Sequence, residues 1–188
     1  MMSQERNSAD ASDLEGFRAY LQFLVAQRTA PRYRAKIDFS GVVQETLLEA
    51  HQELAGGAQV PAGQRLPWLR RILANNLADQ VRRLAAGKRD AAREISLQAL
   101  DDSSHRLEQW VARDLRSHDA VQREEEILLL VAALEKLPSA QREALVLQYW
   151  GGLTLLEISK RLACSRDAVA GLIKRGVRAL RLEMGDVR

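Results

Sequence analysis

Apolar residues recur along this chain at intervals of three and four positions, the spacing that gathers them on one side of an α-helix. The pattern predicts a first helix from Leu14 to about Arg28, before Pro31. A second helix is expected to start near Asp38, with Asp38 or Ser40 as its N-cap. The apolar positions of these two helices are Leu14, Phe17, Leu21, Leu24, Val25, Val42, Val43, Leu47 and Leu48.

A third helix follows residues 55–64, whose glycines and proline predict a loop. The helix should begin around Leu66 and run to about Ala85, with Pro67 tolerated in its first turn. Three helices within residues 14–86 predict one small helical bundle domain. We expect the polar leader before it, residues 1–13, to be disordered.

Weak periodicity and mixed charge over residues 87–120 predict a linker with a short helical turn. A second domain is expected over residues 121–188. Ser139 is expected to cap a helix that continues to Tyr149, where Gly151 and Gly152 end it. The helix before it ends near Leu137 and carries an apolar stripe of Ile127, Leu128, Val131 and Leu134.

The segment GLTLLEISKRLACSRDAV, residues 152–169, has the pattern of a helix-turn-helix. Thr154 and Glu157 form a capping box that opens a short helix. Ala163 and Cys164 supply the tight turn, and Ser165 caps the helix that follows, which should run to about Met184. The alternative is a helical hairpin in an unrelated bundle.

The last helix divides into an apolar side and a polar side. Small residues near its start would allow close approach to a DNA groove, and its cations reach phosphates or base edges. The apolar side comprises Val169, Leu172, Ile173, Gly176, Val177 and Leu180, and the other side Asp167, Ala170, Gly171, Lys174, Arg175 and Arg178.

Composition favours an all-α protein, because four prolines and 5% aromatic residues accompany no alternating β-branched runs. The net charge of +3 is uneven: residues 65–93 hold eight Lys/Arg against two acids, and residues 159–188 eight against three. Residues 101–126 hold eight acids against four arginines. Two basic blocks with an acidic connector indicate two contacts with a polyanion, and ordinary solvated helix faces remain the alternative.

Several function classes find little support in the sequence. The lone cysteine, Cys164, fits a reducing cytoplasm and is expected to be a buried small apolar residue. No apolar run is long enough for a membrane span, and the start is too polar for a signal peptide. The three histidines are scattered, and no carboxylate pair, nucleophile motif or phosphate loop appears, so we expect neither an enzyme nor a bound metal or cofactor.

Three segments together resemble a known family. DFSGVVQETLLEA (residues 38–50) and WLRRILANNLADQVRR (residues 68–83) resemble region 2 of bacterial RNA polymerase sigma factors. LPSAQREALVL (residues 137–147), continued by the helix-turn-helix, resembles their region 4. With a short linker between the two, the chain is similar to the extracytoplasmic-function group of the sigma-70 family over about residues 14–85 and 122–184.

The resemblance implies binding to core RNA polymerase, recognition of the promoter −10 and −35 elements, and DNA melting, with no catalytic residues in the chain itself. The partners would be the β′ clamp helices and β flap of the polymerase, contacted through Asp38, Gln44, Glu45 and Glu49. The −10 region would be read by Trp68, Arg71, Asn75, Arg82 and Arg83. The −35 region would be read by Ser165, Arg166, Asp167, Ala170, Gly171, Lys174, Arg175 and Arg178.

Two positions depart from the family pattern: Gly41 replaces a usual acidic residue, and residues 170–172 replace a more polar run. Exposed surfaces of two small domains would also suit an anti-sigma factor, and the sequence leaves this partner open. A stand-alone helix-turn-helix regulator is the alternative function.

The third predicted helix contains two adjacent asparagines that should face different ways. At about 100° per residue, Asn75 lies beside Arg71 and Arg82, whereas Asn76 falls on the apolar side. An amide beside two arginines suits a flipped base, and the resemblance assigns that contact to Asn75. Asn76 instead requires a structural partner. Trp68 at the helix start would stack on a base or, in our preferred interpretation, anchor the core.

Overall fold

A computed structural model describes residues 14–28, 36–84, 102, 105–106, 109 and 119–185. Over these ranges every regular element is a helix, which confirms the all-α prediction. The polar leader, Pro31 and most of the predicted linker lie outside the described residues.

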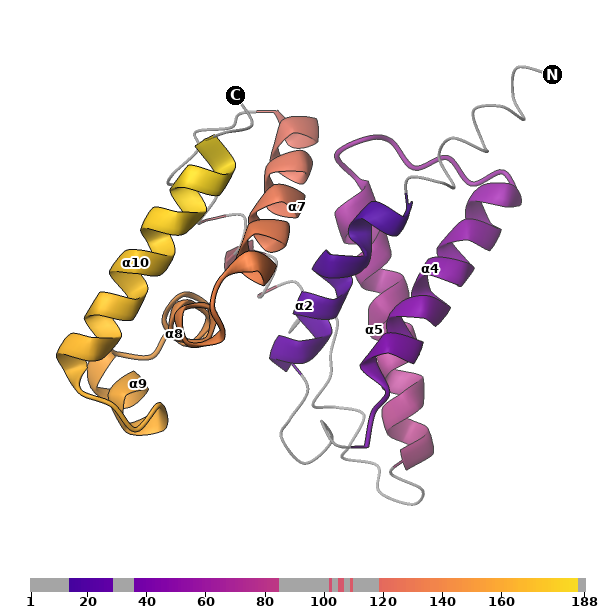
Figure 1. The fold of residues 1–188 in the computed structure, drawn as a ribbon. Helices are drawn as coiled ribbons and strands as arrows, with labels where there is room; N and C mark the ends of the chain where they lie inside the picture. Colours follow the sequence, from indigo (N-terminus) through magenta and orange to yellow (C-terminus); the bar gives the residue numbers. More distant parts are fainter. Residues whose placement is uncertain are drawn as a thin grey trace.

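The first three helices form the right-hand group in Figure 1. A 3-10 turn, η1 (Leu14–Phe17), leads into α2 (Arg18–Arg28), so the first predicted helix opens with a tighter turn. The longer helices α4 (Phe39–Ala55) and α5 (Arg65–Leu84) pack against each other and against α2. The predicted apolar positions are buried except Leu48, which is 57% exposed because the side of α4 that packs holds Val42, Val43, Thr46, Leu47, Ala50 and Leu54.

The later helices form the second group: α7 (Ala120–Lys136), α8 (Ser139–Tyr149), α9 (Leu155–Arg161) and α10 (Arg166–Gly185). Helix α10 lies very close to α8, since a Cβ placed on Gly176 would come within 2.7 Å of Leu145 Cδ1. The prediction that Ser139 caps α8 is wrong: Pro138 holds the N-cap position and no side chain caps the helix. Its fixed φ, near −52°, already suits a helix start.

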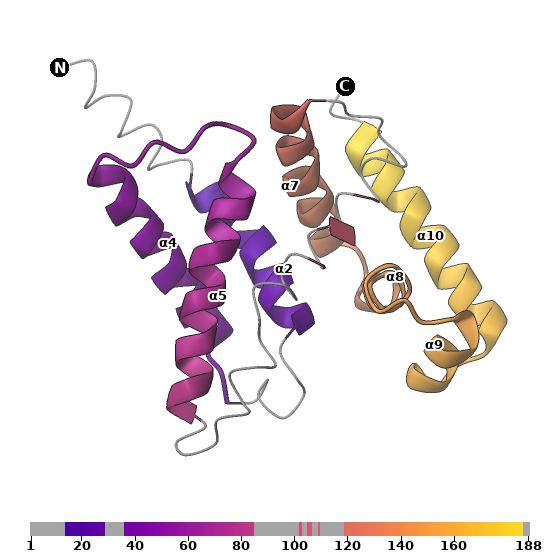
Figure 2. The ribbon, with the colours of Figure 1, turned by 180° about the vertical axis from the view of Figure 1, so that it is seen from behind.

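The two groups meet where α2 packs against α7, as both views show (Figures 1 and 2). The Glu124 carboxylate of α7 accepts hydrogen bonds from the backbone nitrogens of Arg65 and Leu66, at 3.1 and 3.2 Å. Rings of Phe23 and Trp150 meet edge to face, with centroids 5.0 Å apart. One continuous set of buried apolar residues therefore runs through both groups, and the division into separate domains stays a prediction.

A glycine permits this close approach. Gly63, just before α5, has a φ of +83°, which L side chains rarely adopt. A Cβ at this position would lie 2.9 Å from the Cβ of Ala120, at the start of α7. The loop before α5 and the first turn of α7 thus fit together with no room for a side chain.

Candidate nucleic-acid interface

Helix α5 exposes one polar side. Leu69, Leu73, Leu77 and Val81 are fully buried, whereas Asn75 is exposed. Three arginines of the predicted −10 set are exposed on the same helix: Arg71, Arg82 and Arg83. Arg82 pairs with Asp79 one turn earlier, so part of its charge is already compensated within the helix.

Asn76 lies about 100° around the helix from Asn75 and is 9% exposed. Its side-chain nitrogen donates to Thr46 Oγ1 at 3.3 Å and to Glu49 Oε2 at 3.1 Å, both on α4. The structure thus supplies the partner that the sequence required for this residue. The two asparagines have separate environments, one open to solvent and one inside the contact between α4 and α5.

Trp68 is half-buried, and its indole nitrogen donates to Glu53 Oε2 at 2.9 Å. A ring held by its N–H agrees better with the core-anchor interpretation than with a freely stacking platform. Arg70, the neighbour of Arg71, is 8% exposed and donates to the hydroxyl of Tyr20 at 3.1 Å. This member of the basic block faces the interior and leaves the exposed charge to the other arginines.

The helix-turn-helix is built by local capping, as predicted. Thr154 Oγ1 accepts from the Glu157 backbone nitrogen at 3.3 Å, and the Glu157 carboxylate accepts from the Thr154 backbone nitrogen at 2.8 Å. The latter bond and the bond from the Thr154 hydroxyl lower the pKa of Glu157, because they stabilise its ionised form. Ala163 makes the turn in the left-handed region, with φ of 50°. Ser165 Oγ then accepts from the backbone nitrogen of Ala168 at 3.1 Å.

Helix α10 separates its two sides as the sequence indicated. Val169, Ile173, Gly176 and Leu180 are buried. A Cβ on Gly171 would lie 3.1 Å from Nη1 of Arg175, so the guanidinium group lies over the glycine. The exposed residues of the predicted −35 set are Ser165, Arg166, Asp167, Ala170, Lys174, Arg175 and Arg178, with Gly171 partly exposed.

Helix α4 carries the predicted polymerase-facing residues. Gln44 and Glu45 are exposed and Glu49 is partly exposed. Asp38 is exposed too, but it also caps α4 by accepting from the Gly41 nitrogen at 3.0 Å. A Cβ on Gly41 would come within 2.7 Å of Asp38 Oδ2, so the glycine in place of the family's acidic residue leaves room for this carboxylate.

Comparison with known proteins identifies this arrangement. The sigma-70 region 4 family model matches residues 127–180. The ECF RNA polymerase sigma factor SigK of Mycolicibacterium vanbaalenii is 27% identical over 148 residues, 77% of this chain and 70% of that protein. The SigK proteins of Mycobacterium ulcerans and Mycobacterium tuberculosis strain H37Rv are each 28% identical, over 76% of this chain and 72% of each relative.

The region 4 match and the SigK relatives, at 27–28% identity over most of the chain, support an extracytoplasmic-function factor of the sigma-70 family. The helix-turn-helix described above lies inside the matched region 4, and the match to the relatives spans most of the chain. This sigma factor therefore acts in transcription initiation, and the reading as a stand-alone regulator is not favoured.

Local sequence patterns did not reveal one residue that helps to form α5. Glu124 appeared only as part of an acidic block, but its carboxylate, 8% exposed, accepts from the first backbone N–H groups of α5. The first turn of a helix leaves such groups without intrahelical partners, and a negative charge there is favourable. No local signal reveals a cap supplied from about sixty positions away.

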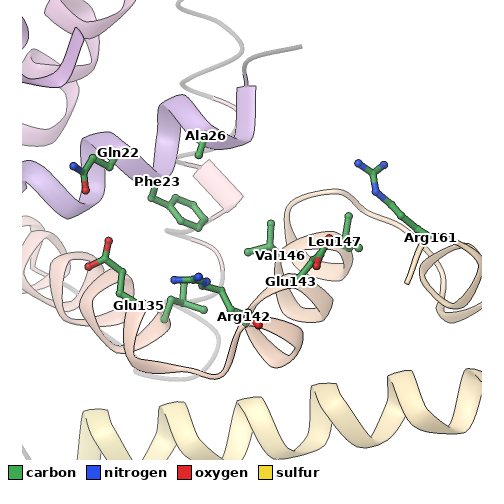
Figure 3. A pocket seen from close by; sticks show the side chains of 11 residues that line it. Gln22, Phe23, Ala26, Glu135, Arg142, Glu143, Val146, Leu147 and Arg161 are labelled. Atoms are coloured by element: carbon green, nitrogen blue, oxygen red, sulfur yellow. The ribbon is translucent and has the colours of Figure 1, made fainter. Parts of the chain in front are cut away.

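A groove of about 450 Å³ lies between α2, α7, α8 and α9 of the sigma factor. Figure 3 shows Phe23 extending from α2 toward Arg142 of α8. Arg161 of α9 lies at the far end of the groove. The wall mixes apolar and charged groups: Gln22, Phe23, Ala26, Leu134, Glu135, Ser139, Arg142, Glu143, Val146, Leu147 and Arg161.

The described residues of the sigma factor form neither a metal site nor a membrane-spanning helix. Within the described ranges, no group of three or more His, Cys, Asp or Glu side chains is placed to hold a metal ion. Among the described helices, none has both the length and the apolar composition of a transmembrane span. Cys164, expected to be buried, is only half-buried at its turn.

Proposed function

We propose that this sigma factor directs core RNA polymerase to promoters by reading the −35 element with α10 and the −10 element with α5, and that it promotes DNA melting. One observation carries the proposal: α5 and α10 each bury an apolar side and expose a side with cations. A single helix-turn-helix would account for only one of these two exposed surfaces.

For α10, the support is the shape and charge of its outward side. Ala170 and Gly171 offer little side-chain bulk near the start of the helix, where recognition helices enter the major groove. Lys174 and Arg178 are exposed further along, within reach of phosphates or base edges. Arg175, whose guanidinium lies over Gly171, is placed near the start of the helix despite its later position in the sequence.

For α5, the support is the exposed amide of Asn75 on the side that carries Arg71. An amide has both a donor and an acceptor and is suited to the edge of an unstacked base, while a cation suits the backbone of the opened strand. Arg82 and Arg83 extend the basic surface toward the end of the helix. Trp68 is assigned to support this surface rather than to stack on a base, because Glu53 holds its indole N–H.

For the polymerase, the support is the polar surface of α4. Asp38, Gln44, Glu45 and Glu49 offer acceptors to a basic partner helix, which we assign to the β′ clamp helices. The exposed Leu48 adds an apolar side chain to the same surface. The region 4 half is assigned to the β flap, and an anti-sigma factor would compete for these exposed surfaces.

The proposal is tested by transcription in a purified system. Sequencing of transcripts after overexpression supplies the promoter motif, and the purified chain is then mixed with core RNA polymerase on that promoter. We expect comigration with core polymerase and run-off transcripts that disappear when either promoter element is scrambled. Absence of core binding at every salt concentration would refute the proposal. Tight sequence-specific duplex binding without polymerase would favour the stand-alone regulator.

A further inference from the structure

The contact between α4 and α5 contains a directed chain of hydrogen bonds. Thr46 is fully buried, and its hydroxyl donates to the carbonyl oxygen of Val42 at 2.8 Å. The one hydroxyl proton is thereby used, so Thr46 Oγ1 can only accept from Asn76. This requirement orients the amide of Asn76 with its NH2 group toward α4.

The same NH2 group reaches Glu49. Its nitrogen lies 3.1 Å from Glu49 Oε2, so one amide nitrogen serves both a buried hydroxyl and a partly exposed carboxylate. Because the amide is fixed from inside by Thr46, its second N–H points to a fixed place at the edge of α4. A long, flexible carboxylate is thus held in one position at the surface.

We infer that Asn76 is a positioning residue for the polymerase contact: it holds the Glu49 carboxylate ready on α4 while its neighbour Asn75 faces DNA. The inference rests on the proposed function, which places Glu49 at the polymerase. Because Asn75 and Asn76 are adjacent in α5, one turn of this helix connects the proposed DNA surface with the proposed polymerase surface. A preordered side chain loses less conformational freedom on binding, so the gain appears as affinity for core polymerase.

The test is a double-mutant cycle on binding of the full chain to core RNA polymerase. Asn76→Leu removes the donor, Glu49→Ala removes the acceptor, and the double variant combines them. We expect Asn76→Leu to weaken core binding roughly two- to tenfold, the effect of ordering one side chain. In the Glu49→Ala background the same change should have almost no effect on core binding. Asn76→Ser, a smaller change whose hydroxyl is too short to reach Glu49, serves if the leucine variant does not fold.

Thr46→Val is the matched control. It removes the other partner of Asn76 at a fully buried position, so it lowers thermal stability and loosens the amide, but it keeps the N–H donor to Glu49. Core affinity should therefore fall less in this variant than in Asn76→Leu. Equal losses of core binding in Thr46→Val and Asn76→Leu, or a loss that persists without Glu49, would overturn the inference. Failure of the wild-type chain to bind core polymerase would instead refute the proposed function itself.

Discussion

The carboxylate of Glu124 lies 3.2 Å from the backbone nitrogen of Leu66, 58 positions earlier in the chain. It also accepts from the nitrogen of Arg65, and it is 8% exposed. Two of the N–H groups that open α5 are thus satisfied by a residue of α7. The first turn of α5, the helix proposed to read the −10 element, is therefore stabilised by α7, which belongs to the second group of helices.

Replacing Glu124 with alanine should destabilise the folded chain by about 1–2 kcal/mol, as for the loss of other helix caps. Glu124→Gln keeps an acceptor and loses the charge, so its effect should be smaller. Denaturant unfolding followed by circular dichroism measures both. The exposed neighbour Glu125 provides the control, and an equal loss in Glu125→Ala would remove the capping role.

The two asparagines of α5 should separate function from stability. Asn75→Ala removes an exposed side chain, so stability should change by less than about 0.5 kcal/mol while promoter opening falls. Asn76→Ala leaves Thr46 and Glu49 without their donor and should lower stability by about 1–3 kcal/mol. Thermal unfolding and permanganate reactivity of the −10 region report the two effects. Equal stability losses with unchanged opening would contradict the assignment of Asn75.

Arg175 should reveal how α10 contacts DNA. If its guanidinium group reads a base, Arg175→Ala costs about 1–3 kcal/mol of binding, and the loss depends on the −35 sequence. Run-off transcription from promoters that differ at single −35 positions measures this dependence. A uniform loss across all sequences, together with a shallower salt dependence, would make Arg175 a phosphate contact.

The turn between α9 and α10 is strained at one residue. Ala163 has a φ of 50°, a conformation that costs a non-glycine residue about 1–2 kcal/mol. Ala163→Gly should therefore raise stability by up to about 1 kcal/mol after the greater freedom of unfolded glycine is included. Gly152→Ala introduces the same backbone strain, because Gly152 has a φ of +65°, while the open space around it rules out a clash. The melting temperature of the Gly152→Ala variant should therefore fall. A lower melting temperature for Ala163→Gly as well would contradict the strain argument.

The capping box should contribute to acid sensitivity. Hydrogen bonds from the backbone and hydroxyl of Thr154 lower the pKa of Glu157 below its ordinary value of 4.5. Its stabilising effect is therefore complete above about pH 4.5 and is lost as the pH falls through the lowered value. Glu157→Gln keeps an acceptor but cannot titrate, so its stability should vary less with pH in this range. Unfolding curves at successive pH values measure the difference, which should vanish if the box does not titrate.

Periodicity and local caps predicted most of the helices. Asp38, the Thr154–Glu157 pair and Ser165 each act within three residues of their partners, so sequence alone exposes them. The prediction that Ser139 caps α8 was wrong because Pro138 already holds the N-cap position. The prediction that Leu48 is buried was wrong because periodicity does not say how wide the covered side of a helix is.

The candidate site was predicted in part. The inward turn of Asn76 followed from the helical period, but its partners on α4 lie 27 and 30 positions away. Glu124 and the fit of Gly63 against Ala120 depend on how α2 meets α7, which no local pattern encodes. Contacts of this kind are set by tertiary packing, where the sequence gives composition but not geometry.

The packing of α2 against α7 has a consequence for reach along DNA. Promoter elements about 25 base pairs apart are separated by about 85 Å, whereas a compact body of this length has a radius of gyration near 16 Å. The 35 residues between α5 and α7 can extend to about 115 Å. If α5 and α10 read both elements at once, as proposed, the two helices must separate. The free energy of that separation is subtracted from the binding free energy at every promoter, so a tighter contact between α2 and α7 weakens binding to all of them.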